Sequence, residues 1–413
     1  MSTRIFFSVG EPSGDQHAAR LINRLLSSSS NVTARGFGGQ AMKDAGCQLD
    51  LDLTEYAVVG LVEVLPKLRQ FFRFVDQAEV IFRNGEVDAV VLVDFPGFNW
   101  HIARRAKEYG IPVFYYCPPQ LWAWGAWRVK KMRRSVDHVL AVLPIEEQFF
   151  SKHGIPTTYV GHPFFDAVKE QKLDVTFING LSQSAKVPQE NTEQETEKEA
   201  GQKIVAVLPG SRTHEVHANW PLMLASMRQL SQQHPTARFL VASYRESQRD
   251  WCRSQMTSSD HSLPIDFHVG KTSEIIEVSH CSMMVSGSVS LEMMARRTPA
   301  AVIYRVGRVM YGFGKCVVGV DSMTLPNLMG PTKVYPEMVS VGDPQPAIDF
   351  LTCTVASMLS DPYYYRKTVQ QLDALRSQHA MGGGTQRAAD WIAERLELAQ
   401  SDELGQGYLE RAA

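Results

Sequence analysis

The chain has 413 residues, of which 44% are hydrophobic and 21% are charged, and its formal net charge at pH 7 is −2. This length predicts two domains with substantial cores, and the near-neutral charge gives no reason to expect a nucleic-acid partner. The scattered cysteines form no C-x-x-C pair, the N-terminus lacks the apolar segment of a signal peptide, and no apolar run reaches transmembrane length, so we expect a cytoplasmic protein.

The first strand, residues 5–9, leads through a glycine-bearing turn into a helix expected from His17 to Leu26. This order is typical of the first unit of a doubly wound α/β domain. The turn lacks the G-x-G-x-x-G spacing of dinucleotide sites, and its two acidic residues make it a poor phosphate cradle. It either binds sugar hydroxyls or is a plain capped turn, and its candidate binding residues are Glu11, Ser13, Gly14 and Asp15.

Residues 50–52 form a D-x-D, a spacing with which some enzymes bind metal ions. The alternating sequence around it favours an edge strand or a loop, and so short a motif arises often by chance. We therefore expect no metal site here.

Between residues 57 and 74, four apolar side chains recur at helical spacing and basic side chains flank them: Leu61, Leu65, Leu68 and Phe72, with Lys67, Arg69 and Arg73. Such a helix either packs on the sheet or lies on an anionic membrane, where it could also hold an acyl chain. Pro66 breaks or kinks the helix in either case.

Five apolar residues at 89–93 predict a buried parallel strand that ends on Asp94. In open α/β sheets, ligands bind at the carboxyl ends of strands, where the strand order reverses. A carboxylate there can act as a general base when the fold brings a hydroxyl within reach. Alternatively, Asp94 merely caps the turn before a helix that begins near Asn99.

The next strand, residues 112–116, ends in a proline- and tryptophan-rich loop that contains Gln120, Trp122 and Trp124. A rigid aromatic loop at a strand end suits sugar rings or lipid tails, although one of the two indoles is expected in the core. The basic residues between 128 and 134 should mostly form a solvated helix face, and some of them should meet lipid phosphate.

The N-terminal domain is expected to span residues 1–168. His162 lies near its end and either reaches the ligand or is a satisfied histidine at the domain edge. Residues 183–202 are rich in Glu, Gln, Thr and Lys with almost no large apolar residue, which marks a solvated segment. We therefore assign residues 169–202 to a linker.

The second half repeats the strand–turn–helix order, with a strand at 204–208. The turn after it contains Gly210, Ser211, Arg212 and Glu215. A glycine turn followed by a cation suits the oxygen of a diphosphate leaving group. The alternative is a surface ion pair between Arg212 and Glu215.

A later strand delivers Ser286, Gly287 and Ser288 to the start of a helix, and Glu292 lies one turn further on. Small residues at a helix start present N–H groups and hydroxyls to phosphate, and Glu292 is placed to accept both hydroxyls of a ribose. The alternative is a serine-rich cap with a surface glutamate. Together with the turn after residue 208, the pattern favours a nucleotide-diphosphate site in a domain of residues 203–350.

Asn327 lies on a loop after an apolar segment, where it either bridges sugar or phosphate or caps a turn. From residue 351 to 413 the chain is expected to be helical, with a glycine-rich break at 382–384. These helices are expected to pack back across a cleft between the two domains.

Taken together, these motifs resemble the lipid-A-disaccharide synthase family, and the similarity runs from about Ile5 to the final helix. The motifs are G-E-P-S-G-D at 10–15, V-D-F-P-G-F-N at 93–99, Q-L-W-A-W at 120–124, G-H-P at 161–163, L-P-G-S-R at 208–212, S-G-S with L-E at 286–292, and L-P-N at 325–327.

The resemblance implies an α/β fold of the GT-B type, with two Rossmann-like domains facing a cleft and C-terminal helices. It implies an inverting glycosyltransferase that condenses UDP-2,3-diacylglucosamine with 2,3-diacylglucosamine 1-phosphate (lipid X), giving lipid A disaccharide 1-phosphate and UDP. By motif match, Asp94 corresponds to the family's essential Asp, and Arg212 and Asn327 to its other important polar positions.

From the residues and the resemblance together, we expect Glu292 and the 286–288 turn to hold UDP while Arg212 offsets charge on the diphosphate. Asp94 is expected to take the proton of the acceptor hydroxyl, without a cofactor or a bound metal. The two tryptophans at 122 and 124 and the apolar stripe at 61–74 would take the acyl chains.

The expected location is peripheral, on the cytoplasmic face of the inner membrane. The sequence leaves the oligomeric state open, a homodimer included. Two alternatives remain: another GT-B enzyme, such as a UDP-N-acetylglucosamine epimerase or a transferase with a soluble acceptor, and a non-catalytic nucleotide-sugar-binding protein.

Overall fold

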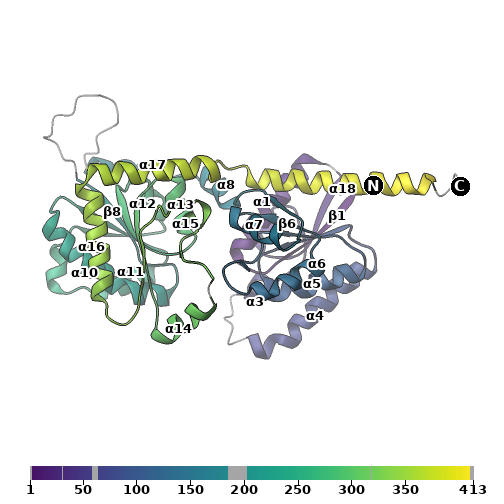
Figure 1. Ribbon diagram of the computed structural model, residues 1–413, viewed down its shortest axis with the longest axis horizontal. Helices are drawn as coiled ribbons and strands as arrows, with labels where there is room; N and C mark the ends of the chain where they lie inside the picture. Colours follow the sequence, from purple (N-terminus) through teal and green to yellow (C-terminus); the bar gives the residue numbers. More distant parts are fainter. Residues whose placement is uncertain (1, 30, 58–63, 185–201, 318, 410–413) are drawn as a thin grey trace, which may run out of the picture. The chain divides into compact units, whose positions relative to one another are not determined.

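The computed structural model describes residues 2–29, 31–57, 64–184, 202–317 and 319–409. The chain divides into two compact units (Figure 1). The first unit contains residues 1–167 and 382–413, and the second contains residues 168–381. The chain therefore leaves the first unit once and returns to it at the glycine run that begins at Gly382.

A parallel sheet forms the centre of the first unit, and its described strands lie in the order β3-β2-β1-β4-β5-β6-β7. All five residues of β4 are buried because helices cover both faces of a parallel sheet. The strand bounds are β1 Thr3–Val9, β2 Val32–Gly38, β3 Gln48–Asp52, β4 Ala89–Val93, β5 Val113–Tyr116, β6 His138–Ala141 and β7 Thr157–Tyr159.

The helices of the first unit follow these strands in turn. They are α1 Pro12–Ser28, α2 Gln40–Asp44, α3 Thr54–Ala57, α4 Val64–Arg83, α5 Pro96–Glu108, η2 Ala126–Arg128, α6 Val129–Ser135, α7 Pro144–Lys152, α8 Pro163–Glu170, which continues into the second unit, and α18 Gly384–Leu409. Helix α1 begins at Pro12, five residues before the expected start, because proline suits the first position of a helix.

The second unit repeats this plan with the strand order β10-β9-β8-β11-β12-β13. Its strands are β8 Ile204–Leu208, β9 Arg238–Ser243, β10 Ile265–Val269, β11 Cys281–Val285, β12 Ala300–Arg305 and β13 Glu337–Ser340. Its helices are α9 Val175–Ser184, α10 Thr213–Gln233, α11 Glu246–Ser254, η3 Ser258–Ser262, α12 Thr272–Val278, α13 Val289–Ala295, α14 Arg308–Val317, α15 Leu325–Met329, α16 Gln345–Ser360 and α17 Pro362–His379.

In both units the strand order reverses between two neighbouring strands, β1 and β4 in the first and β8 and β11 in the second. Each reversal opens a crevice at the carboxyl ends of the strands, which is where ligands bind in doubly wound sheets. The sequence motifs after residues 9, 93, 208 and 285 all lie at these two points.

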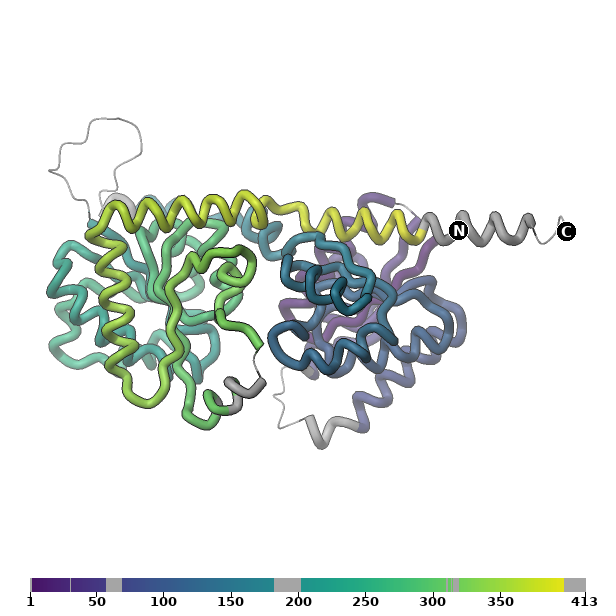
Figure 2. The backbone as a smooth tube through the Cα atoms, viewed as in Figure 1, coloured from purple at the N-terminus to yellow at the C-terminus, as the bar shows by residue number. Residues whose placement is uncertain are grey.

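The C-terminal helix α18 belongs to the first unit, where it packs along α1 (Figures 1 and 2). The Asp166 carboxylate accepts hydrogen bonds from the N–H groups of Gly383 and Thr385 at the start of this helix. Further along, Trp391 stacks on His138, with 4.1 Å between ring centroids. Helices α16 and α17, by contrast, belong to the second unit.

The segment expected to be a linker is partly folded. Helix α9 lies within it and packs against α12 of the second unit. Asp174, just before α9, accepts a hydrogen bond from the Lys271 ammonium at 2.7 Å. The rest of the expected linker, residues 185–201, lies outside the described residues.

The apolar stripe is only partly described, because residues 58–63 and the side chains of residues 64–68 lie outside the description. Helix α4 continues past Pro66, which lies in its first described turn. Phe74 is buried and Phe71 packs beside it on the core, whereas Phe72 is 52% exposed. The described part of the helix therefore has a core face and an exposed aromatic side chain.

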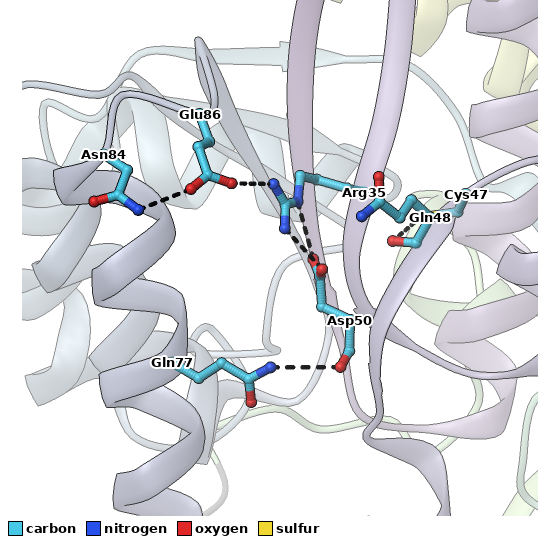
Figure 3. Close-up of polar contacts among 7 residues, drawn as sticks. All are labelled: Arg35, Cys47, Gln48, Asp50, Gln77, Asn84 and Glu86. Atoms are coloured by element: carbon cyan, nitrogen blue, oxygen red, sulfur yellow. Dashed lines mark hydrogen bonds and ion pairs between the residues drawn. The ribbon is translucent and has the colours of Figure 1, made fainter.

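Both D-x-D carboxylates have structural partners, and Figure 3 shows those of Asp50. The Arg35 guanidinium donates to both oxygens of Asp50, at 2.8 and 3.1 Å, and also to Glu86. Asp52 accepts from the Thr54 hydroxyl at 2.7 Å. The motif thus ties strand β3 to β2 and to the start of helix α3.

Candidate active site

Backbone strain is concentrated where strands β4 and β5 end. Four non-glycine residues in the described chain have a positive φ, and three of them lie here: Asp94 at 47°, Phe95 at 45° and Cys117 at 50°. Such conformations cost about 1–3 kcal/mol each and persist only where the surroundings enforce them. Strain of this kind gathers at functional sites, and it places the Asp94 side chain on a sharp strand-to-helix turn.

Buried hydrogen bonds hold the strained turn in place. The Asn99 side-chain amide donates to the backbone carbonyls of Ser8, Val93 and Asp94, and its oxygen accepts from the Ser8 hydroxyl at 2.6 Å. The Tyr115 hydroxyl also donates to the Asp94 carbonyl, at 2.6 Å. The Asp94 backbone carbonyl is therefore held by two side chains, Asn99 and Tyr115.

The Asp94 carboxyl has a raised pKa. Burial raises its pKa from the ordinary 3.8 to about 6, and the neighbouring Glu11 carboxylate contributes further, while a hydrogen bond with the Phe95 backbone opposes the shift. A general base works best when its pKa lies near the operating pH. Its raised pKa and its place at the carboxyl end of β4 make Asp94 a candidate for a general base.

The turn after β1 forms the other side of this crevice. A Cβ atom on Gly14 would lie 3.8 Å from the Asp94 Cβ, and one on Gly10 would lie 2.1 Å from the Phe95 ring, so both glycines permit a close approach. Glu11 and Ser13 are exposed at the start of α1. The structure thus brings the expected 11–14 residues beside Asp94.

Asp15 serves the fold directly. Its carboxylate is buried and accepts hydrogen bonds from the backbone N–H groups of Gly39, Ala41 and Met42, at 2.8 to 3.2 Å. These N–H groups open helix α2, so Asp15 links α1 to α2. Its oxygens are occupied by the protein itself.

The aromatic loop after β5 presents one indole to solvent. Trp122 is buried beside Glu146, while Trp124 is 46% exposed and Gln120 is exposed. Burial raises the Glu146 pKa to about 7, and hydrogen bonds from the Val142 and Leu143 N–H groups oppose the shift. Trp124 and Gln120 are the members of this loop that can meet a ligand.

His162 is half-buried and lies beside His17. Burial lowers its pKa to about 3, with His17 adding to the shift, and the two rings lie 6.0 Å apart in a T-shaped contact. Its Nδ1 accepts from the Phe164 N–H. The low pKa keeps the ring neutral, and one of its two nitrogens has a hydrogen-bond partner two residues along the chain.

In the second unit, the turn after β8 is organised by Glu215. One carboxylate oxygen accepts from the backbone N–H groups of Ser211 and Arg212, and the other pairs with the Arg212 guanidinium at 3.2 Å. The surface ion pair left open by the sequence is therefore present. Because 73% of the Arg212 side chain is exposed, most of the guanidinium still faces solvent at the crevice.

The turn after β11 lies beside it. The Ser286 hydroxyl donates to the Met323 carbonyl, whereas Gly287 and Ser288 are exposed at the start of α13. Glu292 is buried and accepts from Arg296 at 2.9 Å. Arg296 also pairs with Glu277, so Glu292 belongs to a small ion-pair network.

Asn327 makes the turn-holding contacts that the sequence left open. Its amide donates to the Tyr335 carbonyl at 2.8 Å, and its oxygen accepts from the N–H groups of Val334 and Tyr335. The side chain is buried and makes three of the four hydrogen bonds available to an amide. It orders the loop that leads into the amino end of β13, which is parallel to β12.

Two important residues were missed by sequence reasoning. Tyr115 appears only as part of an apolar strand, and nothing in the sequence indicates that its hydroxyl reaches Asp94. In the sequence, Glu146 looks like an ordinary acidic residue in the first turn of a helix. In the fold it is buried, and both this burial and the charge of Asp94 raise its pKa. Both depend on contacts between residues distant in the chain.

Solved structures of known proteins share this architecture. UDP-GlcNAc 2-epimerase from Neisseria meningitidis covers 95% of this chain and 100% of its own, with a TM-score of 0.62 and 14% identity. A glycosyltransferase from Rickettsia africae covers 96% and 98%, with a TM-score of 0.57 and 9% identity. Two Rossmann-like units of this kind define the GT-B fold of nucleotide-sugar glycosyltransferases and epimerases.

A family model, described as lipid-A-disaccharide synthetase, matches residues 5–349. A lipid-A-disaccharide synthase of Geobacter sulfurreducens is 30% identical over 405 residues, 96% of this chain and 98% of the relative. The enzyme of the same name from Myxococcus xanthus is 30% identical over 393 residues, 95% and 97% of the two chains. The chain belongs to the lipid-A-disaccharide synthase family, and it is a glycosyltransferase of lipid A biosynthesis.

Proposed function

We propose that the protein transfers the diacylglucosamine unit of UDP-2,3-diacylglucosamine to the 6-hydroxyl of lipid X with inversion. The observation that supports this most strongly is Asp94, a carboxylate with a pKa of about 6 on a strained turn at the reversal point of the first sheet. A glycosyl acceptor hydroxyl is a weak nucleophile and needs a base of this kind.

The chemistry is a single displacement. Asp94 takes the proton of the acceptor hydroxyl as the oxygen bonds to the anomeric carbon of the donor. The bond from that carbon to the diphosphate oxygen breaks, and UDP leaves with the electron pair. Attack from the face opposite the leaving group converts the α linkage of the donor to β, through a transition state with oxocarbenium character. Asp94 then returns its proton to water.

The second unit would hold the donor. The exposed N–H groups and hydroxyl around Gly287 and Ser288 suit phosphate oxygens, and Arg212 offsets the charge that grows on the departing diphosphate. Glu292 would accept the ribose hydroxyls after an adjustment of its pair with Arg296. The three hydrogen bonds of Asn327 go to the backbone of the loop before β13, so we assign Asn327 a role in ordering this loop rather than in touching the reacting atoms.

The acyl chains imply contact with the cytoplasmic face of the inner membrane. Within the part of the chain that the structure describes, no helix is long and apolar enough to cross a bilayer. The first unit does expose Phe72, Trp124 and Trp127, and exposed aromatic side chains suit the membrane–water interface. We therefore infer peripheral attachment through this unit.

The Asp94→Asn variant tests the proposed base. It keeps the shape of the side chain but cannot accept the proton, so we expect kcat to fall by about 10²–10⁴-fold. UDP affinity, measured by calorimetry, should stay within about twofold of the native value because UDP binds the second unit. Normal turnover by this variant would rule out Asp94 as the base.

A further inference from the structure

A basic pocket lies on the first unit between helix α5 and the η2–α6 segment. Its volume is about 580 Å³, within the range of small-molecule sites. Five cationic side chains line it, together with Trp100 and Trp127: Arg104, Arg128, Lys130, Lys131 and Arg134. None of its lining residues is acidic.

The charge around this pocket is strongly one-sided. Residues 95–136 contain eight Lys and Arg residues but a single acidic one, Glu108. Glu108 pairs with Arg104. Among the described residues, no carboxylate lies within ion-pair distance of Lys130, Lys131 or Arg134. Cations gathered in this way repel one another, so an anion in the pocket would be held firmly.

Aromatic faces hold two of the cations in place. The Arg128 guanidinium lies 4.3 Å from the Trp124 ring centroid and 5.6 Å from that of Trp127. The Lys131 ammonium lies 5.5 Å from the centroid of the buried Trp100. Contacts of this kind orient a cation without neutralising it. The charges are therefore ordered before any ligand arrives.

The titration of Lys131 agrees with this arrangement. Burial lowers its pKa, and Arg128 lowers it further. A bound anion would offset the repulsion between Lys131 and Arg128 and part of the cost of burying the Lys131 ammonium. The pKa of Lys131 should therefore rise when the pocket is occupied.

The pocket also lies close to the proposed base. Gly97 and Trp100, which line it, belong to α5, and this helix begins two residues after Asp94. The Trp100 ring packs on Tyr115, with 6.0 Å between centroids, and the Tyr115 hydroxyl bonds the Asp94 carbonyl. Two side chains thus connect Lys131 to the Asp94 turn.

We propose that this pocket binds the anomeric phosphate of the acceptor and thereby places the acceptor's 6-hydroxyl at Asp94. The inference rests on the proposed function, because it assigns a subsite to that reaction. A phosphomonoester carries nearly two negative charges at neutral pH, which suits several unpaired cations better than a phosphodiester does. The pocket would then select acceptors that carry the phosphate.

Matched neighbours on α6 provide the test. Arg134 lines the pocket, whereas Arg133 is an exposed arginine on the same helix that does not. We would compare Arg134→Gln and Lys130→Gln/Arg134→Gln with Arg133→Gln, measuring kcat and KM for lipid X in neutral detergent micelles free of phospholipid. All changed positions are exposed, so the fold should be kept.

The expected result is a rise of about tenfold or more in the KM for lipid X in the pocket variants, with the KM for the UDP-sugar unchanged and Arg133→Gln near native. An acceptor lacking the phosphate should be used poorly by the native protein and equally poorly by the variants. In addition, dodecyl phosphate in the same micelles should compete with lipid X, and dodecyl maltoside should not.

Normal turnover with an unchanged KM for lipid X in the pocket variants would overturn the inference, as would an equal effect of Arg133→Gln. If the variants lose only their binding to anionic phospholipid vesicles, the pocket meets bilayer headgroups and the assignment is also wrong. Failure of the proposed function is distinct, since the native protein would then release no UDP from the acylated substrates.

Discussion

Asp94 combines three costs at one residue: a left-handed backbone, burial of a carboxylate and proximity to Glu11. Each cost disfavours folding, and each also serves a base that must be partly desolvated and fixed in direction. The Asn99 side chain offsets part of this cost by bonding three backbone carbonyls around the turn. Stability and activity should therefore oppose each other at this position.

The first prediction concerns stability. The pKa of Asp94 is about 6 in the fold and near 3.8 when unfolded, so between these values the folded state binds more protons. The free energy of unfolding therefore falls as the pH rises through this window, by about 2–3 kcal/mol in total. Asn carries no charge and also tolerates a positive φ.

Asp94→Asn should thus be more stable than the native protein at pH 8, by up to about 2–3 kcal/mol, and nearly equal to it at pH 4. Urea unfolding at the two pH values measures the difference. A gain of the same size at pH 4 and pH 8 would mean that charge burial is not its cause.

The second prediction concerns the rate. If Asp94 acts as the base, kcat/KM should fall about tenfold per pH unit below about pH 6, since only the ionised carboxylate can accept a proton. The pH profile of the residual activity of Asp94→Asn should not show this fall at acidic pH. An acid limb centred near pH 4 in the native protein would indicate an unperturbed carboxylate instead.

At the scale of elements, glycine makes the approach of α1 to the Asp94 turn possible. A Cβ at position 10 would meet three atoms of the Phe95 ring between 2.1 and 2.5 Å. Because Phe95 has its own strained backbone and follows Asp94 directly, any shift of its ring is passed to the carboxylate. The geometry of the proposed base is thus set by packing between two loops.

Gly10→Ala should therefore lower kcat at least about tenfold by misplacing Asp94, with UDP affinity unchanged. Gly180→Ala is a suitable control, since that glycine lies in helix α9 with nothing within 4 Å of an added Cβ. The steady-state rates of both variants are the measurement. Native activity of Gly10→Ala would contradict the prediction, because it would show that the Phe95 ring can move aside without displacing Asp94.

The cap of α18 offers a separate test. Asp166 accepts from two N–H groups at the start of this helix, so Asp166→Ala should destabilise its attachment by about 1–2 kcal/mol and increase proteolysis at residues 381–384. Asp361→Ala removes a similar cap, from α17, and should leave that cleavage rate unchanged. Equal protection of the native and Asp166→Ala chains would show that packing against α1 suffices.

For the molecule as a whole, sequence reasoning succeeded where the signal is local. The apolar run at 89–93 is strand β4, and the strand expected before the 286–288 turn is β11. The motifs after them reach the two reversal points because parallel strands align their carboxyl ends. The family resemblance is confirmed by the match over residues 5–349.

What the sequence could not predict depends on contacts between distant residues. The hydrogen bond between Ser8 and Asn99 joins residues 91 positions apart, and Asp15 accepts a hydrogen bond from the N–H group of Gly39, 24 positions later. The pairing of Asp50 with Arg35 likewise follows from the register of β2 and β3 rather than from the D-x-D spacing. Such contacts also decide which of two neighbouring indoles, Trp122 or Trp124, is buried.

The most direct measurement is UDP release from UDP-2,3-diacylglucosamine and lipid X in detergent micelles containing EDTA, with the native protein and Asp94→Asn side by side. We expect UDP release that requires both acylated substrates and falls by at least about 10²-fold in the variant. Equally fast release with deacylated sugars, or undiminished release by Asp94→Asn, would contradict it.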